Sequence, residues 1–139
     1  MSKKVREIMT GTPVKVGKLS SLHEAARRMR EDDIGDVLVM DDGHLAGLLT
    51  DRDLVVRAIA DGMDPEQTTV SEICSKQMVT MGPDEDAERA VELMREHALR
   101  RLPVVEDDRP IGIVSLGDLA IDRDRHSALA DISAAQPNT

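Results

Sequence analysis

Two stretches of the chain decide the fold, Gly47-Leu48-Leu49-Thr50-Asp51-Arg52-Asp53 and Gly112-Ile113-Val114-Ser115-Leu116-Gly117-Asp118. In both, a glycine and two apolar residues lead to a hydroxyl residue, and an aspartate follows three positions later. The apolar residues predict the end of a buried strand, and the hydroxyl residue predicts the start of a helix. Each stretch therefore predicts a strand that runs directly into a helix.

The two stretches belong to a longer internal repeat. A shift of about 65 positions aligns residues 5–54 with residues 70–119 without a gap. About fourteen of roughly fifty aligned positions carry the same residue, more than composition should produce. The identical pairs include Val5/Val70, Gly17/Gly82, Met29/Met94, Gly47/Gly112 and Asp53/Asp118. The sequence therefore predicts two copies of one fold unit.

Each copy is expected to begin with a short strand, around residues 14–16 or 79–81, followed by a helix. Apolar residues with helical spacing predict the packed face of each helix. These residues are Leu22, Ala25, Ala26 and Met29 in the first copy and Ala87, Ala90, Val91 and Met94 in the second. Ser21 with Glu24 predicts a capping box, and Pro83-Asp84 marks the start of the second helix.

Two more strands and a final helix complete each copy. Apolar runs at 37–40 and 46–49 flank the turn Asp41-Asp42-Gly43, and runs at 102–105 and 111–114 flank Glu106-Asp107-Asp108. Aspartate and glycine between apolar runs are typical of turns. The final helices are expected to start at Asp51 and Leu116.

The domain organisation follows from the repeat. We expect a first repeat at residues 5–62, a linker at 63–69, a second repeat at 70–125 and a C-terminal extension at 126–139. One copy alone would bury too little apolar surface to be comfortably stable. Two copies packed face to face about a pseudo-twofold axis would share a core, and clefts at such junctions commonly bind small molecules.

Composition excludes several classes of protein. The formal net charge of -9 over 139 residues argues against nucleic acid or an anionic membrane as a partner. No apolar stretch is long enough to span a membrane and the start lacks a secretory apolar core, so we expect a cytoplasmic protein. Phe, Tyr and Trp are absent, so a bound base would lie between aliphatic side chains and backbone.

No pattern in the sequence indicates catalysis. The chain lacks a P-loop and a GxGxxG motif, and its four histidines show no metal-binding spacing. Cys74 is the single cysteine, which excludes an intramolecular disulfide, and it is interpreted as a packing residue. We therefore expect neither an enzyme nor a required cofactor or metal.

The hydroxyl–aspartate pairs allow two interpretations. As a capping box, Thr50 with Asp53 and Ser115 with Asp118 would satisfy the free N–H groups of a helix start. As a ligand site, the same helix start would present N–H donors, a hydroxyl and a carboxylate to a bound molecule. The carboxylate can accept both hydroxyls of a ribose while the other groups face phosphate.

The doubled motif, together with Leu99-Arg100-Arg101-Leu102-Pro103-Val104-Val105, resembles the cystathionine beta-synthase (CBS) domain pair. The resemblance covers residues 5–122 and implies an α+β fold with a beta-alpha-beta-beta-alpha unit per repeat, a Bateman-type module. It also implies adenosine ligands (AMP, ADP, ATP, S-adenosylmethionine or dinucleotides) in two composite clefts.

Carried over by position, Asp53 and Asp118 would hold ribose, and Thr50 and Ser115 would lie near phosphate. The resemblance implies that Thr50 and Asp53 face Met78, Val79 and the turn Arg100, Arg101, Leu102. It implies that Ser115 and Asp118 face Pro13, Val14 and the turn Gly35, Asp36, Val37.

These clefts would be unlike, because Arg100 and Arg101 align with Gly35 and Asp36. A carboxylate close to a phosphate is unfavourable by on the order of a few kcal/mol. The Asp53 cleft is therefore expected to be the principal site for a charged nucleotide. A solvated turn or surface ion pairs are the alternative for the two arginines.

Two functions stay open at this point. The first is a stand-alone, non-catalytic sensor in which an adenosine nucleotide acts as a regulatory ligand, read by a second copy or by an unknown effector protein. The family resemblance makes a homodimer the default. The second is a structural dimerisation or partner-docking module with empty clefts. The sequence names neither the adenosine ligand nor the effector.

Overall fold

The computed structural model describes residues 3–123 and Ile132 and divides the chain into two compact units. Residues 14–78 form the first unit, and residues 3–13 together with residues 79–123 form the second unit. The C-terminal extension expected at 126–139 lies, apart from Ile132, outside the described residues.

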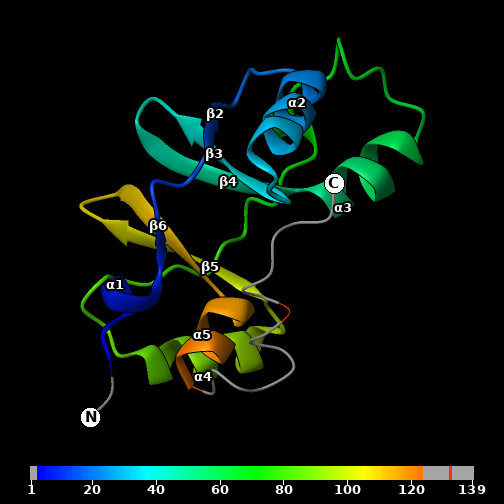
Figure 1. Ribbon diagram of the computed structural model, residues 1–139. Coiled ribbons are helices and arrows are strands. Elements are labelled where there is room, and N and C mark those ends of the chain that lie inside the picture. The colour runs from blue at the N-terminus through cyan, green and yellow to red at the C-terminus, as the bar shows by residue number, and fades with distance from the viewer. Residues whose placement is uncertain (1–2, 124–131, 133–139) are drawn as a thin grey trace. The chain divides into compact units, whose positions relative to one another are not determined.

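The first unit is a three-stranded sheet with helical cover (Figure 1). β2 (Lys15–Gly17) pairs in parallel with β3 (Asp36–Asp41), which pairs antiparallel with β4 (His44–Thr50). α2 (Leu22–Asp32) connects β2 to β3, and β4 continues into α3 (Asp51–Asp53) and the π-helical turn η1 (Leu54–Ile59). The short helix η2 (Val70–Glu72) follows. The core joins apolar side chains of β2, α2, β3, β4, η1 and η2.

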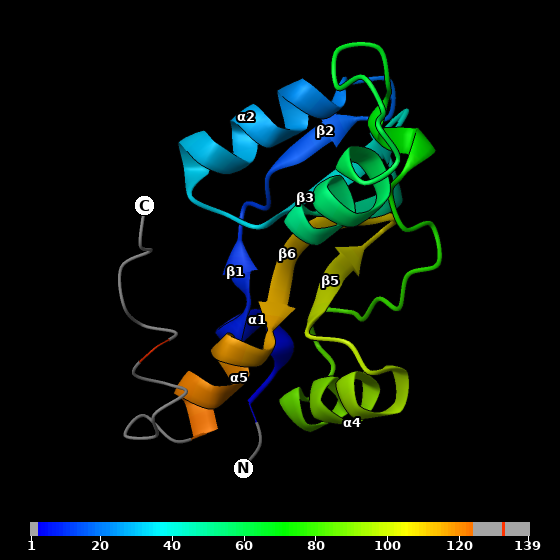
Figure 2. The same ribbon diagram turned by 90° about the vertical axis from the view of Figure 1, so that its right-hand side faces the viewer.

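The second unit repeats this plan. β5 (Arg101–Glu106) and β6 (Arg109–Ser115) form an antiparallel hairpin, and β1 (Thr10–Gly11) pairs with β6. α1 (Val5–Ile8), α4 (Ala87–His97) and α5 (Leu116–Arg123) complete the unit. Figure 2 shows α4 and α5 on the same side of this hairpin. The predicted α+β class and the doubled order of elements are confirmed, but the strand expected at 79–81 is reduced to one bridge between Met81 and Val104.

The first residues of each sequence repeat, which we call its leading segment, belong to the compact unit formed mainly by the other repeat. Residues 3–13 open the first repeat in sequence, yet Thr10 and Gly11 pair with Ile113 and Gly112 of β6. Residues 70–78 open the second repeat, yet Ser75 exchanges backbone hydrogen bonds with Leu48 of β4. The compact units and the sequence repeats are therefore offset by one leading segment.

Close backbone contact explains the glycine of each motif. A Cβ atom at Gly47 would lie 2.6 Å from Cys74 Sγ and 3.0 Å from the Ser75 carbonyl oxygen. At Gly112 it would lie 2.5 Å from Met9 Sδ and 2.8 Å from the Thr10 carbonyl oxygen. Only a residue without a side chain lets the leading segment approach the sheet this closely.

An ion pair adds to the attachment of the first leading segment. Arg6 Nε lies 2.9 Å from Asp84 Oδ1, ahead of α4. Hydrogen bonding to this guanidinium lowers the pKa of the Asp84 carboxyl. The pair is exposed, so the buried Val5 side chain contributes more to the attachment than the ion pair does.

The helix predictions need two corrections. Leu22, Ala25 and Met29 are buried in α2, but Ala26 is exposed. The buried face of the helix is narrow, and Ala26 lies beside it rather than on it. Ser21 Oγ accepts a hydrogen bond from Glu24 N, as expected of an N-cap. The Glu24 carboxylate pairs with Arg27 instead of returning to Ser21, so the capping box predicted there is incomplete.

In the second unit α4 starts after Asp86, two residues beyond the Pro83-Asp84 signal. Ala87, Ala90 and Met94 are buried as predicted, and Val91 is partly buried. Both hairpin turns have left-handed backbone, at Asp42 and Gly43 and at Asp107 and Asp108. These conformations explain the aspartates and the glycine in the predicted turns.

None of the helices in the described part of the chain combines the length and apolar character that crossing a membrane requires.

We predict that Gly112→Ala and Gly47→Ala each lower the free energy of unfolding by about 1–3 kcal/mol, since backbone atoms must move to admit the methyl group. Gly17→Ala is the control, because its Cβ would meet only Ser20 Oγ at 3.9 Å. Urea unfolding followed by circular dichroism measures the difference. Equal unfolding midpoints for Gly112→Ala and Gly17→Ala would contradict the close-packing argument.

Candidate functional site

A complete capping box forms at both motif helices. In the first unit Asp53 N donates to Thr50 Oγ1 at 3.1 Å, and Thr50 N donates to Asp53 Oδ2 at 2.9 Å. In the second unit the equivalent bonds join Asp118 N to Ser115 Oγ at 3.0 Å and Ser115 N to Asp118 Oδ2 at 2.9 Å. The structural interpretation of both pairs is therefore confirmed.

The capping boxes leave one carboxylate oxygen of each aspartate available. In the first unit Asp53 Oδ1 lies 3.7 Å from Arg57 Nε, one helical turn along the chain. Asp118 Oδ1 has no hydrogen-bond partner among the described residues. A carboxylate oxygen can accept two hydrogen bonds, so the Asp118 side chain keeps its capacity for a ligand while it caps the helix.

A pocket of about 340 Å³ lies at the start of α5 in the second unit. The pairing of β5 with β6 brings its walls together, since Arg101 lies opposite Ser115 and Leu116 N donates to the Arg100 carbonyl oxygen at 2.8 Å. The lining residues are Arg100, Arg101, Ser115, Leu116, Gly117, Asp118 and Ile121. Two cations, a hydroxyl, a carboxylate and two aliphatic side chains thus surround one hollow.

In the first unit, the corner where β4 passes into α3 has the same backbone geometry as the start of α5 but different side chains. Asp36 lies opposite Thr50 in the β3–β4 register, and Asp51 N donates to the Gly35 carbonyl oxygen at 2.9 Å. The Asp51 carboxylate packs against Gly35, where a Cβ atom would lie 3.0 Å from Asp51 Oδ2. This corner is therefore richer in carboxylates.

The remaining predicted site residues divide by burial. Val37 and Leu102 are fully buried, and each packs in the core of its own unit. Val14 accepts a hydrogen bond from Leu38 N and packs on the first core, and Val79 packs on the second core. Pro13 and Met78 are half-buried and stand where the chain passes from one unit to the other.

The structure groups the two arginines with Asp118 in the pocket of their own unit. The composite clefts implied by the family resemblance join residues of different units, and they stay predictions.

Sequence reasoning missed two kinds of residue. Leu116, Gly117 and Ile121 line the pocket but carry no polar group that would single them out. Arg57 lies beside Asp53 and also donates from Nη1 to the Ile73 carbonyl oxygen at 3.0 Å. Its spacing of four positions from Asp53 was the signal that could have identified this contact.

Cys74 is a buried packing residue in this structure. The Cys74 side chain is buried against Gly47, and this burial raises the pKa of its thiol. A raised thiol pKa disfavours the nucleophilic thiolate. Within residues 3–123, no group of three or more His, Cys, Asp or Glu side chains is arranged to hold a metal ion.

Comparison with known proteins assigns the chain to a family. The sequence model of the CBS domain matches twice, at residues 5–59 and 70–121. The chain belongs to the CBS domain family and carries a tandem pair of these domains.

Three relatives illustrate the likeness. The CBS domain-containing protein YhcV of Bacillus subtilis (strain 168) is 40% identical over 133 residues, which cover 93% of this chain and 94% of that protein. The crystal structure of Hypoxic Response Protein I with two coordinated zinc ions is 36% identical, with a TM-score of 0.77 and coverage of 86% and 98%. The CBS domain pair of protein MJ0100 in complex with 5′-methylthioadenosine and S-adenosyl-L-methionine is 26% identical, with a TM-score of 0.77 and coverage of 86% and 94%.

The capping boxes predict a cost that is independent of any ligand. Asp53→Ala and Asp118→Ala should each lower the free energy of unfolding by about 0.5–2 kcal/mol, because a backbone N–H loses its acceptor. Asp53→Asn and Asp118→Asn retain an acceptor oxygen and should lose less. Urea unfolding without added nucleotide tests this, and wild-type stability in both alanine variants would show that the caps do not contribute.

Proposed function

We propose that the chain is a non-catalytic regulatory module that binds an adenosine-containing ligand. The observation that carries the proposal is the Asp118 pocket, which combines Arg100, Arg101 and a helix start with an aspartate that has one oxygen free of hydrogen bonds to the described residues. Guanidinium groups bind phosphate through paired hydrogen bonds. The free carboxylate oxygen of Asp118 can accept the ribose hydroxyls.

The aliphatic walls of the pocket suit a base in a protein without aromatic residues. Leu116 and Ile121 flank the helix start, so apolar contact replaces aromatic stacking. The likeness to the MJ0100 pair, whose structure contains two adenosine compounds, supports the same ligand class for this chain. AMP, ADP, ATP and S-adenosylmethionine are the candidates.

We further propose a cytoplasmic homodimer, in which ligand binding is read by the second copy or by an effector protein. Three apolar side chains of η1 support self-association, since Val55, Val56 and Ile59 are 57%, 47% and 70% exposed. In a symmetric dimer the same helix of a second copy can cover this patch. A second copy is therefore the occupant that we assign to the η1 surface.

The ligand proposal predicts a specific thermal stabilisation. A ligand that binds only the folded chain at a hundredfold excess over its Kd should stabilise it by about 2.7 kcal/mol. Melting followed by circular dichroism with AMP, ADP, ATP and S-adenosylmethionine measures this effect. Asp118→Asn, which keeps an acceptor for the cap, should lose much of the stabilisation.

Nucleotide that stays bound during purification offers a second readout. The chain has no Trp or Tyr and absorbs little at 280 nm, so a strong band near 260 nm would reveal bound nucleotide. If no candidate raises the melting temperature and the sample carries no nucleotide, the partner-docking function replaces the sensor function.

The dimer proposal predicts that Ile59→Glu gives monomers, because a buried unpaired carboxylate in the contact is costly. Leu19→Glu is the matched control, since Leu19 is 75% exposed in the same unit but lies outside η1. Sedimentation velocity measures the mass of each variant. A monomeric wild type, or an Ile59→Glu variant with the mass of the wild-type dimer, would contradict this assignment.

A further inference from the structure

The two motif corners differ in charge at equivalent positions. The Asp118 pocket is lined by two arginines and one aspartate. The residues at the corresponding positions of the first repeat include one arginine, Arg52, and three aspartates, Asp36, Asp51 and Asp53. The positions that line the pocket therefore carry a net positive charge in the second unit, and the corresponding positions carry a net negative charge in the first.

The difference extends from charge to shape. Position 35, which corresponds to Arg100, is a glycine, and the Asp51 carboxylate fills the adjacent space at 3.0 Å from a Cβ built there. A hydrogen bond of 2.8 Å from Arg52 N to Asp51 Oδ1 fixes this carboxylate. In the second unit the residue that corresponds to Asp51 is Leu116, which lines the open pocket. The negatively charged Asp51 side chain thus lies next to position 35. The equivalent position in the second unit is Arg100.

Phosphate responds to these two corners in opposite ways. A phosphate group gains charge-assisted hydrogen bonds from arginine. It is repelled by a fixed carboxylate at short range. The adenosine part of a ligand is uncharged, so its binding is much less sensitive to the same side chains.

We propose that the chain binds one phosphate-bearing adenosine ligand, at the Asp118 pocket, and that Asp51 and Gly35 make the first-unit corner reject phosphate. This inference rests on the proposed function and specifies the ligand class and the residues that select it. Arg100 is the positive determinant in the second unit, and Asp51 is the negative determinant in the first. The inference also reverses the preference for Asp53 expected from the sequence, because the arginines line the pocket of Asp118.

Titration calorimetry of the full chain with AMP and with adenosine tests the proposal. The wild type should bind one AMP per chain, and Arg100→Ala should weaken AMP binding by about tenfold to a hundredfold, as expected for charge-assisted hydrogen bonds. Arg100→Ala should leave adenosine binding within about threefold of the wild type, a difference too small for a lost hydrogen bond. Asp51→Leu, which introduces the residue of the second repeat, should add a second AMP event and leave the first unchanged.

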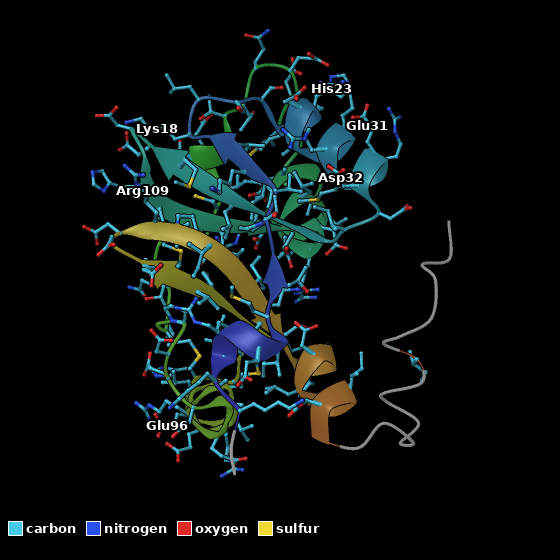
Figure 3. The ribbon with its side chains drawn as sticks, turned by 60° about the vertical axis from the view of Figure 1, so that its left-hand side comes forward. Lys18, His23, Glu31, Asp32, Glu96 and Arg109 are labelled. Carbon is cyan, nitrogen blue, oxygen red and sulfur yellow. The ribbon has the colours of Figure 1, made fainter. Side chains whose placement is uncertain are left out.

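Arg109→Ala is the control for net charge. Arg109 is exposed at the tip of the β5–β6 hairpin, at the opposite end of β6 from α5 (Figure 3). It changes the charge of the same unit by the same amount as Arg100→Ala but lies outside the pocket lining. AMP binding should stay at the wild-type level in this variant.

Three results would overturn the inference. Two equal AMP sites in the wild type would remove the difference between the corners. Loss of AMP binding in Asp53→Asn but not in Asp118→Asn would place the site in the first unit instead. An equal loss of AMP and adenosine binding in Arg100→Ala would show that Arg100 does not select phosphate. Adenosine binding in each of these cases would leave the proposed function intact, whereas a folded wild type that binds neither compound would contradict both.

Discussion

The antiparallel register of the two hairpins is the constraint on which the site depends. Pairing of β5 with β6 puts Arg101 opposite Ser115, and pairing of β3 with β4 puts Asp36 opposite Thr50. A slip of one residue would move every side chain of a strand to the other face of its sheet. Left-handed turn residues at one end and a helix cap at the other hold each register in place. The register therefore decides which side chains lie beside Thr50 and Ser115 in each corner.

Much of the fold could be predicted from local patterns, and the errors concern contacts between distant residues. The strands of both hairpins, the capping boxes at Thr50 and Ser115 and the left-handed turns all have local signals. The pairing of Thr10 with Ile113 has none, because backbone pairing between distant segments leaves little trace in either segment. The motif glycines held the missing information, since Gly112 has no side chain where Thr10 and Met9 approach.

The polar residues of the candidate site could be predicted from the sequence, but not the aliphatic residues beside them or the way the residues are grouped. Asp118, Ser115 and the two arginines were all identifiable from the repeat, and the structure brings them together in one pocket. Their grouping depends on the hairpin register, which places Arg100 next to Leu116 through a backbone hydrogen bond. Aligning the two repeats shows which positions correspond. It does not show which residues contact one another in the folded chain.

The helix cap uses only one of the two carboxylate oxygens of Asp118. Asp118 Oδ2 accepts from Ser115 N, while Oδ1 is directed to no donor among the described residues. The cap fixes the carboxylate before any ligand arrives, so little side-chain entropy is lost on binding. Both repeats preserve the cap, so the differences between the corners lie at neighbouring positions. The exchange of Leu116 for Asp51 and of Arg100 for Gly35 changes the charge of a corner while its backbone stays the same. A duplicated unit can in this way keep one fold and acquire two different binding preferences.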